Sequence, residues 1–434
     1  MSEWRKVRVD EIAEKIAIGP FGSRMKSDTY TKIGVPVIRG TNLTGGRSFS
    51  GEWVYISEED ADQLASCNVT EGDLVFPHRG AIGEVGIVPG DRDRYLLSSS
   101  LMKLKCDPKK AHSLYLFYFF KSHEGRHQLL KNASQVGTPG IGQPLSSLKS
   151  IELELPALSN QRAIAHILGT FDDKIELNRR MNETLEAIAR AMFKSWFVDF
   201  DPVRAKMSGE PPASICQRLG LTPDLLALFP DRLVDSVLGE IPEGWSASTL
   251  SNHIEIFDSK RVPLSNRERE KRKGAYPYYG ATSVMDYVDD FIFDGIYVLI
   301  GEDGSVVKEN GEPFLQYVWG KFWVNNHAHV LQAKKPVSNE HLLLMLKQTN
   351  VASFVTGAVQ LKISQGNLKR IPFVSAPGTI NENFAKIIAP LFDMIRARED
   401  EIQTLIEVRD ELLPKLLSGQ LRVSEADSNI EVCA

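Results

Sequence analysis

The chain lacks the features that define several large classes of protein. Its apolar runs, such as residues 114–120, are far shorter than the roughly twenty residues that cross a bilayer. The first ten residues are charged and have no apolar stretch of the kind that directs export. The few cysteines form no Cys-x-x-Cys pair, which argues against a zinc ribbon, a redox motif or a disulfide scaffold; they are Cys67, Cys106, Cys216 and Cys433. Reduced thiols and a cytoplasmic location are therefore expected.

Motifs for common catalytic chemistry are also missing. The sequence has no Gly-x4-Gly-Lys-Ser/Thr phosphate loop, no Gly-x-Ser-x-Gly elbow and no Asn/Asp-Pro-Pro-Tyr/Phe tetrapeptide. His123, Glu124 and His127 match the His-Glu-x-x-His pattern of zinc peptidases, but Gly125 between them weakens a helix. These residues are expected to end a surface helix that begins at Leu114, and no metal site is predicted. A zinc peptidase is kept as an alternative, and His327-x-His329 is a weaker metal candidate.

Charge does not point to nucleic acid at first sight. The 434 residues include 51 Lys and Arg against 56 Asp and Glu, a net charge of −5. A DNA-binding domain is usually basic. Many acidic residues lie in stretches with helical periodicity, however, so loops elsewhere can still be locally basic.

Several short patterns occur twice at a nearly constant separation. Trp4 and Trp245 precede similar apolar patterns with an offset of 241 (245 − 4). Further along, Gly80-x-x-Gly-x-Val matches Gly301-x-x-Gly-x-Val with an offset of 221 (301 − 80). This period is far too long for a solenoid. The chain is therefore predicted to contain two copies of a whole domain, each rich in short strands and Gly/Pro turns.

A long segment with a heptad pattern follows each copy. Gly169 and Pro390 interrupt both segments at equivalent places, which predicts a short helix, a break and then a helix of about 26 residues, roughly 39 Å long. Two such helices in the same phase are expected to pair as a coiled coil. The a/d positions in the first segment are Ile164, Leu168, Phe171, Ile175, Asn178, Asn182, Leu185, Ala189, Met192 and Trp196, and in the second Phe384, Ile388, Leu391, Ile395, Arg398, Ile402, Leu405, Arg409, Leu412 and Leu416.

The predicted fold class is mixed α/β, with two globular regions that are each followed by a long helix. The connector between the copies is rich in proline, and one or two short helices are expected in it around residues 219–238. The predicted boundaries are 1–157 and 245–377 for the globular regions, 158–200 and 378–422 for the helical segments, 201–244 for the connector and 423–434 for a flexible tail.

Basic and amide side chains gather in the predicted loops, and these are the types that contact phosphates and base edges. The densest group is the run from Arg267 to Lys273, although Glu268 and Glu270 dilute it and a solvated turn is the alternative. The candidate DNA-binding residues are Ser23, Arg24, Lys26, Arg39, Asn42, His78, Arg79, Gln135, Thr138, Lys260, Arg261, Arg267, Arg269, Lys271, Arg272, Lys273, Tyr279, Asn326, Lys362 and Gln365. The candidate subunit-interface residues are Phe171, Ile175, Asn178, Leu185, Met192, Trp196, Leu391, Ile395, Ile402, Leu405 and Leu412.

Four stretches carry a resemblance to a known family. They are Leu155-Pro156 with Gln161-Arg162, the run from Met192 to Val203, the run from Gly239 to Trp245, and the run from Leu412 to Gly419. In these stretches the chain resembles the specificity subunit of type I restriction–modification systems, over almost its whole length.

The resemblance implies a non-catalytic subunit with two target recognition domains, each of which reads one half of a split site in double-stranded DNA. The two helices would pair antiparallel and set the spacer between the half-sites. Two modification subunits would bring S-adenosylmethionine for adenine N6 methylation, and restriction subunits would use ATP and Mg²⁺. The chain itself would bind no cofactor and no membrane. A coiled-coil scaffold that never touches DNA is the remaining alternative.

Overall fold

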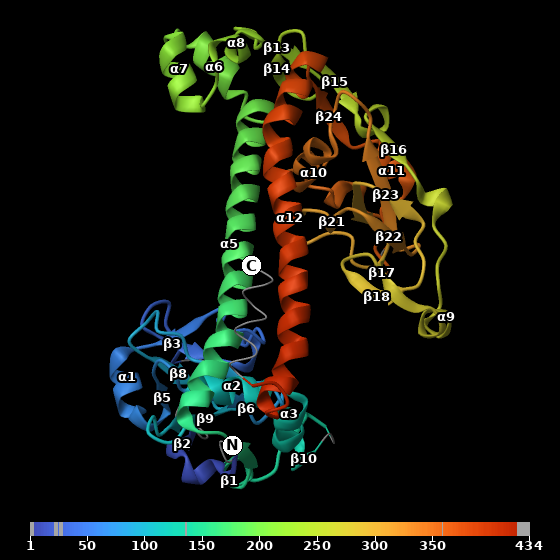
Figure 1. The fold of residues 1–434 in the computed structure, drawn as a ribbon. Helices are drawn as coiled ribbons and strands as arrows, with labels where there is room; N and C mark the ends of the chain where they lie inside the picture. Colours follow the sequence, from blue (N-terminus) through green and yellow to red (C-terminus); the bar gives the residue numbers. More distant parts are fainter. Residues whose placement is uncertain (1–3, 21–24, 26–28, 135–136, 358, 423–434) are drawn as a thin grey trace. The chain divides into compact units, whose positions relative to one another are not determined.

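The computed structural model describes residues 4–20, 25, 29–134, 137–357 and 359–422 (Figure 1). The chain separates into two compact units, the first made of Met1–Asn178 with Glu401–Ala434 and the second of Arg179–Asp400. The predicted tail at 423–434 lies outside the described residues. Within the described ranges, none of the helices has the length and apolarity to cross a membrane.

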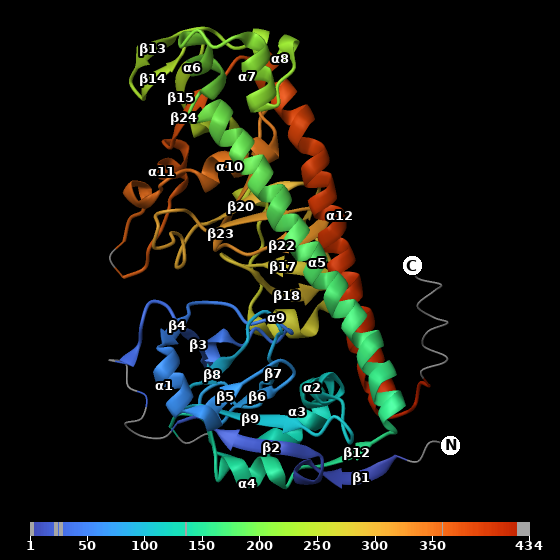
Figure 2. The same cartoon turned by 90° about the vertical axis from the view of Figure 1, so that its left-hand side faces the viewer.

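The first unit contains two four-stranded sheets, ordered β2–β9–β6–β7 and β4–β3–β8–β5, and a separate pair of β1 with β12. Figure 2 shows β5 and β8 of this unit between α1 and α2. Six consecutive residues of α2 are buried, as expected of a helix that is apolar all round. The elements are β1 (Arg5–Arg8), β2 (Ala13–Ile18), β3 (Val35–Ile38), β4 (Val54–Ile56), α1 (Glu58–Gln63), β5 (Asn68–Val69), β6 (Leu74–Pro77), β7 (Gly86–Ile87), β8 (Tyr95–Leu97), β9 (Leu101–Cys106), α2 (Ser113–Lys121), α3 (His123–Leu130), β10 (Ala133–Ser134), β11 (Gly140–Ile141), α4 (Pro144–Lys149) and β12 (Glu152–Leu155).

The second unit repeats this plan. Its sheets have the orders β16–β23–β20–β21 and β18–β17–β22–β19, and β15 pairs with β24. The elements are β15 (Ser246–Thr249), β16 (Ile254–Ile256), α9 (Asn266–Lys271), β17 (Lys273–Tyr279), β18 (Val284–Val288), β19 (Phe293–Asp294), β20 (Tyr297–Gly301), β21 (Leu315–Val318), β22 (Lys321–Val324), β23 (Ala328–Ala333), α10 (Asn339–Lys347), α11 (Gln365–Lys369) and β24 (Pro372–Ser375).

The two sheet orders correspond strand for strand. A parallel pairing also recurs within these sheets, between β3 and β8 in the first unit and between β17 and β22 in the second. This correspondence confirms the predicted duplication and the mixed α/β class.

The structural equivalent of Gly80 in the second unit is not the glycine that the sequence pattern indicated. The Gly80 N–H donates to the Pro139 carbonyl and the Gly304 N–H to the Leu361 carbonyl, both at 2.9 Å. Both glycines have positive φ, +81° and +77°. Gly80 therefore corresponds to Gly304, and the predicted match with Gly301 was wrong by three residues. The error arose because glycines occur three residues apart in both copies.

Two 40-residue helices, α5 (Leu158–Phe197) and α12 (Gly378–Leu417), contribute to both units. Within the first unit Asp172 bonds to Arg409 and Asn178 to Glu401, and within the second Asn182 lies against Ile395. The partner numbers fall along α12 as those on α5 rise, so the helices run antiparallel. Every predicted a/d position is buried or half-buried, which confirms the predicted pairing.

The predicted breaks at Gly169 and Pro390 do not occur. The Gly169 carbonyl accepts a 3.2 Å bond from Arg47 Nη1, and a Cβ at this position would lie 3.3 Å from Leu114, so the glycine permits close packing. Pro390 is exposed and lies beside the buried Phe392 and Ile388, whose packing offsets the missing backbone donor. Each helix is therefore about 60 Å long at 1.5 Å per residue, not 39 Å.

The connector is more structured than expected. It contains three short helices, α6 (Asp201–Met207), α7 (Pro212–Leu219) and α8 (Pro223–Ala227), and a hairpin of β13 (Leu233–Ser236) with β14 (Gly239–Pro242). Prolines begin α7 and α8, where a missing N–H costs nothing. The connector packs into the core of the second unit through buried Val203, Ile215 and Phe229.

Candidate nucleic-acid interface

Two candidate residues of the first unit are buried and were wrongly predicted to contact DNA. Asn42 is fully buried, and its amide donates to the Ser50 and Glu52 carbonyls at 2.9 and 3.1 Å while its oxygen accepts from the Arg39 N–H. His78 is 4% exposed, and its Nε2 lies 3.0 Å from the Ser99 carbonyl. Both side chains form hydrogen bonds between loops, and both are too buried to contact a ligand.

The other described candidates of this unit reach solvent. Arg79 and Thr138 are exposed, whereas Arg39 is half-buried and donates to the Glu52 carbonyl. Ser23, Arg24, Lys26 and Gln135 lie outside the described residues.

In the second unit, helix α9 carries the densest basic segment. A capping box between Ser265 and Glu268 begins the helix, and Figure 1 shows it at the edge of the unit farthest from α12. Arg267 and Lys271 are exposed. Arg269 is 9% exposed, since its guanidinium donates to Leu264 O at 2.7 Å and to Asp286 at 3.3 Å. The prediction that Arg269 contacts DNA was therefore wrong, and this residue anchors the helix to β18.

The basic residues after α9 are paired with carboxylates. Arg272 donates to Asp289 at 2.9 Å and lies 4.8 Å from the centre of the Trp323 ring, and Lys273 lies 2.5 Å from Asp286. Lys273 is exposed and Arg272 half-buried, so both retain some access to solvent.

The remaining candidates outside this segment differ in exposure. Lys260 and Asn326 are exposed, and the Lys260 ammonium lies 5.0 Å from the centre of the Phe257 ring. Tyr279 is half-buried, with its ring edge-on to Phe322.

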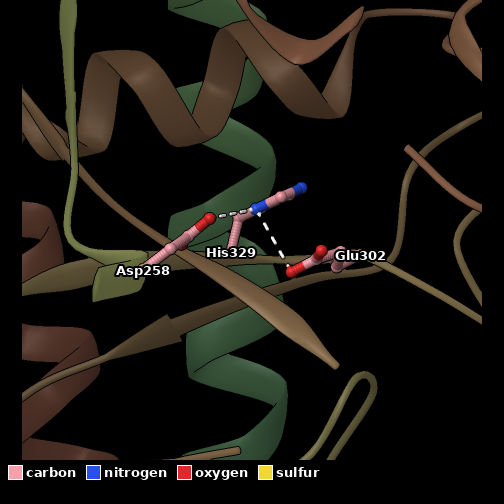
Figure 3. Close-up of side chains that lie close together, drawn as sticks. All are labelled: Asp258, Glu302 and His329. Atoms are coloured by element: carbon pink, nitrogen blue, oxygen red, sulfur yellow. Dashed lines mark hydrogen bonds and ion pairs between the residues drawn. The ribbon is translucent and has the colours of Figure 1, made fainter. Parts of the chain in front are cut away.

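Asp258, Glu302 and His329 form one largely buried cluster (Figure 3). Three candidate DNA-binding residues that are distant in sequence contact it, namely Arg261, Lys362 and Gln365. Asp258 Oδ2 lies 2.6 Å from His329 Nδ1 and accepts a 2.6 Å bond from Gln365. The Asp258 Oδ1 atom accepts from the Val330 N–H at 3.0 Å.

Glu302 completes this cluster with two further cations. It accepts a 2.7 Å bond from Arg261 and lies 3.1 Å from the Lys362 ammonium. Arg261 also donates to the Ala328 carbonyl at 2.6 Å, and its side chain is only 11% exposed. The predicted DNA contact by Arg261 was therefore wrong, whereas Lys362 and Gln365 remain exposed.

His329 is fully buried, and both of its ring nitrogens face acceptors. Nδ1 lies 2.6 Å from Asp258 Oδ2 and Nε2 lies 2.8 Å from the Ile363 carbonyl, so both nitrogens have an oxygen within hydrogen-bond distance. Burial raises the pKa of the Asp258 carboxyl, but the hydrogen bond and charge of His329 outweigh it and hold this pKa below its ordinary value. Burial also raises the pKa of the Glu302 carboxyl. The hydrogen bond from Arg261 and the neighbouring positive charges outweigh this effect, so the pKa of Glu302 is lower than its ordinary value.

The same cluster has the donor set of a metal site, because its three possible ligand atoms lie within 4.8 Å of one another. Arg261 and Lys362 already neutralise the carboxylates, however, and a divalent ion would have to displace them. The residues therefore fit an ion-pair network better than a metal centre. His327, the other half of the weak metal motif, pairs separately with Asp303.

The His-Glu-x-x-His residues belong to α3, which is separate from the buried helix α2 rather than its exposed end. Ser122 caps α3, and Gly125 is buried where a Cβ would lie 2.0 Å from the Phe119 carbonyl. His123 and Glu124 line an open cavity of about 580 Å³ with Glu152. The metal-like cluster found among the described residues does not include His123, Glu124 or His127.

The candidate subunit-interface residues lie between the chain's own helices. Trp196 is 1% exposed and packs against Phe229 and Phe384, and the other residues of this set are buried or half-buried. Their main contacts are thus within this chain.

The sequence did not indicate the ion-pair cluster formed by Asp258, Glu302 and His329. Asp258 and Glu302 were not among the candidates, and His329 was noted only as a metal ligand. Asp258 and His329 are 71 residues apart, so no local pattern connects them.

Comparisons with known proteins agree with this architecture. A family model for the type I restriction modification DNA specificity domain matches residues 1–187 and 242–407. The HindI specificity subunit of Haemophilus influenzae is 26% identical over 483 residues, which cover 97% of this chain and 100% of the relative. The MjaIX specificity subunit of Methanocaldococcus jannaschii is 27% identical, with 86% and 85% covered. The crystal structure of the type I S subunit from M. genitalium has the same fold, with a TM-score of 0.54 at 18% identity and 96% of both chains covered. The chain belongs to the family of type I restriction–modification specificity subunits.

Proposed function

We propose that this chain reads a bipartite DNA site for a type I restriction–modification complex, with one globular region on each half-site. The observation that carries the proposal is the duplication, in which two readers with the same sheet orders are joined by one antiparallel helix pair. Two similar readers suit a target made of two separate sequence elements. Under this proposal, the helix pair sets the length of the unrecognised spacer between the two half-sites.

Local charge supports contact with DNA despite the net charge of −5. Arg267 and Lys271 of α9 are exposed, and so is Arg79 in the first unit. Acidic residues lie on the long helices instead, where Glu186 pairs with Lys347 and Asp400 accepts a bond from Trp319. The whole-chain charge averages these different surfaces.

The proposal assigns the chemistry to partner subunits. Two modification subunits would carry S-adenosylmethionine and methylate adenine N6 after extruding the base from the duplex. Restriction subunits would supply ATP- and Mg²⁺-dependent translocation and cleavage. The chain itself would be non-catalytic, bind no cofactor and act in the cytoplasm.

The test is to map methylated adenines in DNA from cells that express the chain with its modification subunits. A bipartite motif with an unread spacer is expected. Replacing residues 1–157 by the matching region of a relative should change one half of the motif and leave the other half intact. A change in both halves would contradict the two-reader proposal, and a complex without sequence-selective DNA binding would favour the scaffold alternative.

A further inference from the structure

Both readers carry a small hairpin at the same place in the fold. In the second unit Thr356 and Lys362 exchange two backbone hydrogen bonds of 2.8 Å, and in the first unit β10 pairs with β11. Each hairpin is held to the turn after a central strand by two matching bonds. Ile363 N–H donates to Glu302 O and Ile141 N–H to His78 O, both at 2.9 Å, in addition to the glycine bonds described above.

The second hairpin presents side chains to solvent. Val359 is 101% exposed relative to an isolated residue, Leu361 is 37% exposed, and Gln360 and Lys362 are exposed as well. Gly357 has a φ of +94°, and a Cβ there would lie 2.1 Å from the Gln360 carbonyl, so the tight turn depends on glycine.

The ion-pair cluster of Asp258, Glu302 and His329 holds the base of this hairpin in place. His329 binds the Ile363 carbonyl, Lys362 pairs with Glu302, and Gln365 just beyond the hairpin binds Asp258. The hairpin is thus hydrogen-bonded at its base, while the side chains of Val359 and Gln360 are exposed to solvent. A rigid support of this kind reduces the entropy lost when a ligand is bound.

We propose that the hairpin closed by Thr356 and Lys362 enters the major groove of the second half-site and reads bases there. This inference rests on the proposed function. The major groove admits a two-stranded ribbon. The side chains of the hairpin are of types that contact DNA. The Gln360 amide can pair with adenine, the Val359 side chain can contact a thymine methyl group, and Lys362 can contact a phosphate. Asp258, Glu302 and His329 act as positioning residues beneath it.

The test uses the full chain in complex with its modification subunits. Val359→Ala/Gln360→Ala removes the proposed contacts, and Gly357→Ala distorts the hairpin itself. Val237→Ala is a matched control, since Val237 is a 92% exposed valine at the tip of the β13–β14 hairpin in the connector. Thermal unfolding of each complex shows whether it remains folded.

We expect the double variant to lose about tenfold discrimination at one or two adjacent positions of one half-site. The other half-site and the control should be unchanged. An unaltered motif in the double variant, or an equal loss at both half-sites, would overturn the inference. If the wild-type complex itself shows no bipartite motif, the proposed function fails first, so the two failures can be distinguished.

Discussion

Arg409 on α12 donates a 2.6 Å hydrogen bond to Asp172 on α5, and the Tyr118 hydroxyl donates to the other oxygen of the same carboxylate. The Asp172 side chain is only 11% exposed. This contact joins the two long helices to α2 of the first unit.

Arg409→Ala should lower the free energy of unfolding by about 3 kcal/mol, because it leaves a largely buried carboxylate without its charged partner. Lys415→Ala is the control on the same helix, where the exposed pair with Glu411 should contribute no more than about 0.5 kcal/mol. Urea unfolding measures both. Equal losses in the two variants would show that the burial of Asp172 has no energetic consequence.

The two asparagines of the helix seam should respond in opposite directions to leucine. Asn182 is 8% exposed, and its Oδ1 has no hydrogen-bond partner among the described residues, so Asn182→Leu should raise the free energy of unfolding by about 1 kcal/mol. Asn178 donates a 2.8 Å hydrogen bond to Glu401, so Asn178→Leu should lower the free energy of unfolding. Thermal unfolding of the two variants distinguishes these outcomes, and a gain in both would contradict the role given to the Glu401 bond.

His341 should make the second unit sensitive to mild acid. It is buried among Phe193, Phe197 and Phe384, and burial, with the nearby His253 adding to it, lowers the pKa of His341 to about 3. The unfolded chain binds this proton near pH 6.5. Between these values only the unfolded state is protonated, so stability falls as pH falls, by up to about 1.4 kcal/mol per pH unit.

His341→Leu should therefore flatten the decline in stability between pH 6.5 and pH 4. His127→Leu, at an exposed position of α3, is the control and should leave the slope unchanged. The measurement is the free energy of unfolding at several pH values. A slope that persists in His341→Leu would assign the acid sensitivity to other groups.

The helix pair should determine the spacer if the proposed function holds. Inserting one heptad into α5 and one at the facing position of α12 keeps the seam in phase and adds about 10 Å. The unread spacer should grow by about one to three base pairs while both half-sites stay the same. Mapping of methylated adenines reads out both quantities. Altered half-sites with an unchanged spacer would argue against this role.

Much of the architecture could be predicted because its signals are local. The seam positions from Ile164 to Trp196 repeat at heptad spacing, and the duplication leaves matching tryptophans at the start of each copy. The breaks at Gly169 and Pro390 were wrongly predicted because intrinsic propensity was given more weight than packing. Arg47 and Leu114 lie against Gly169, and no pattern around the glycine indicates them.

The candidate binding surface was harder to predict, because a sequence shows residue types but not their partners. Arg269 and Arg267 look equivalent in the sequence, yet one is fixed by Asp286 and the other is exposed. Arg261 is neutralised by Glu302, which is 41 residues away. Pairings over such distances depend on the finished sheets.

The hairpins of the two units are attached to the fold through backbone groups. The bonds from Ile141 and Ile363 and from Gly80 and Gly304 use only main-chain N–H and C=O atoms. Such bonds do not depend on which side chains the hairpins carry, apart from the requirement for Gly357 in the second hairpin. If the hairpins read DNA as proposed, selection can therefore exchange their exposed residues one at a time without loss of the scaffold, and a new target preference can arise in one copy while the other keeps its own.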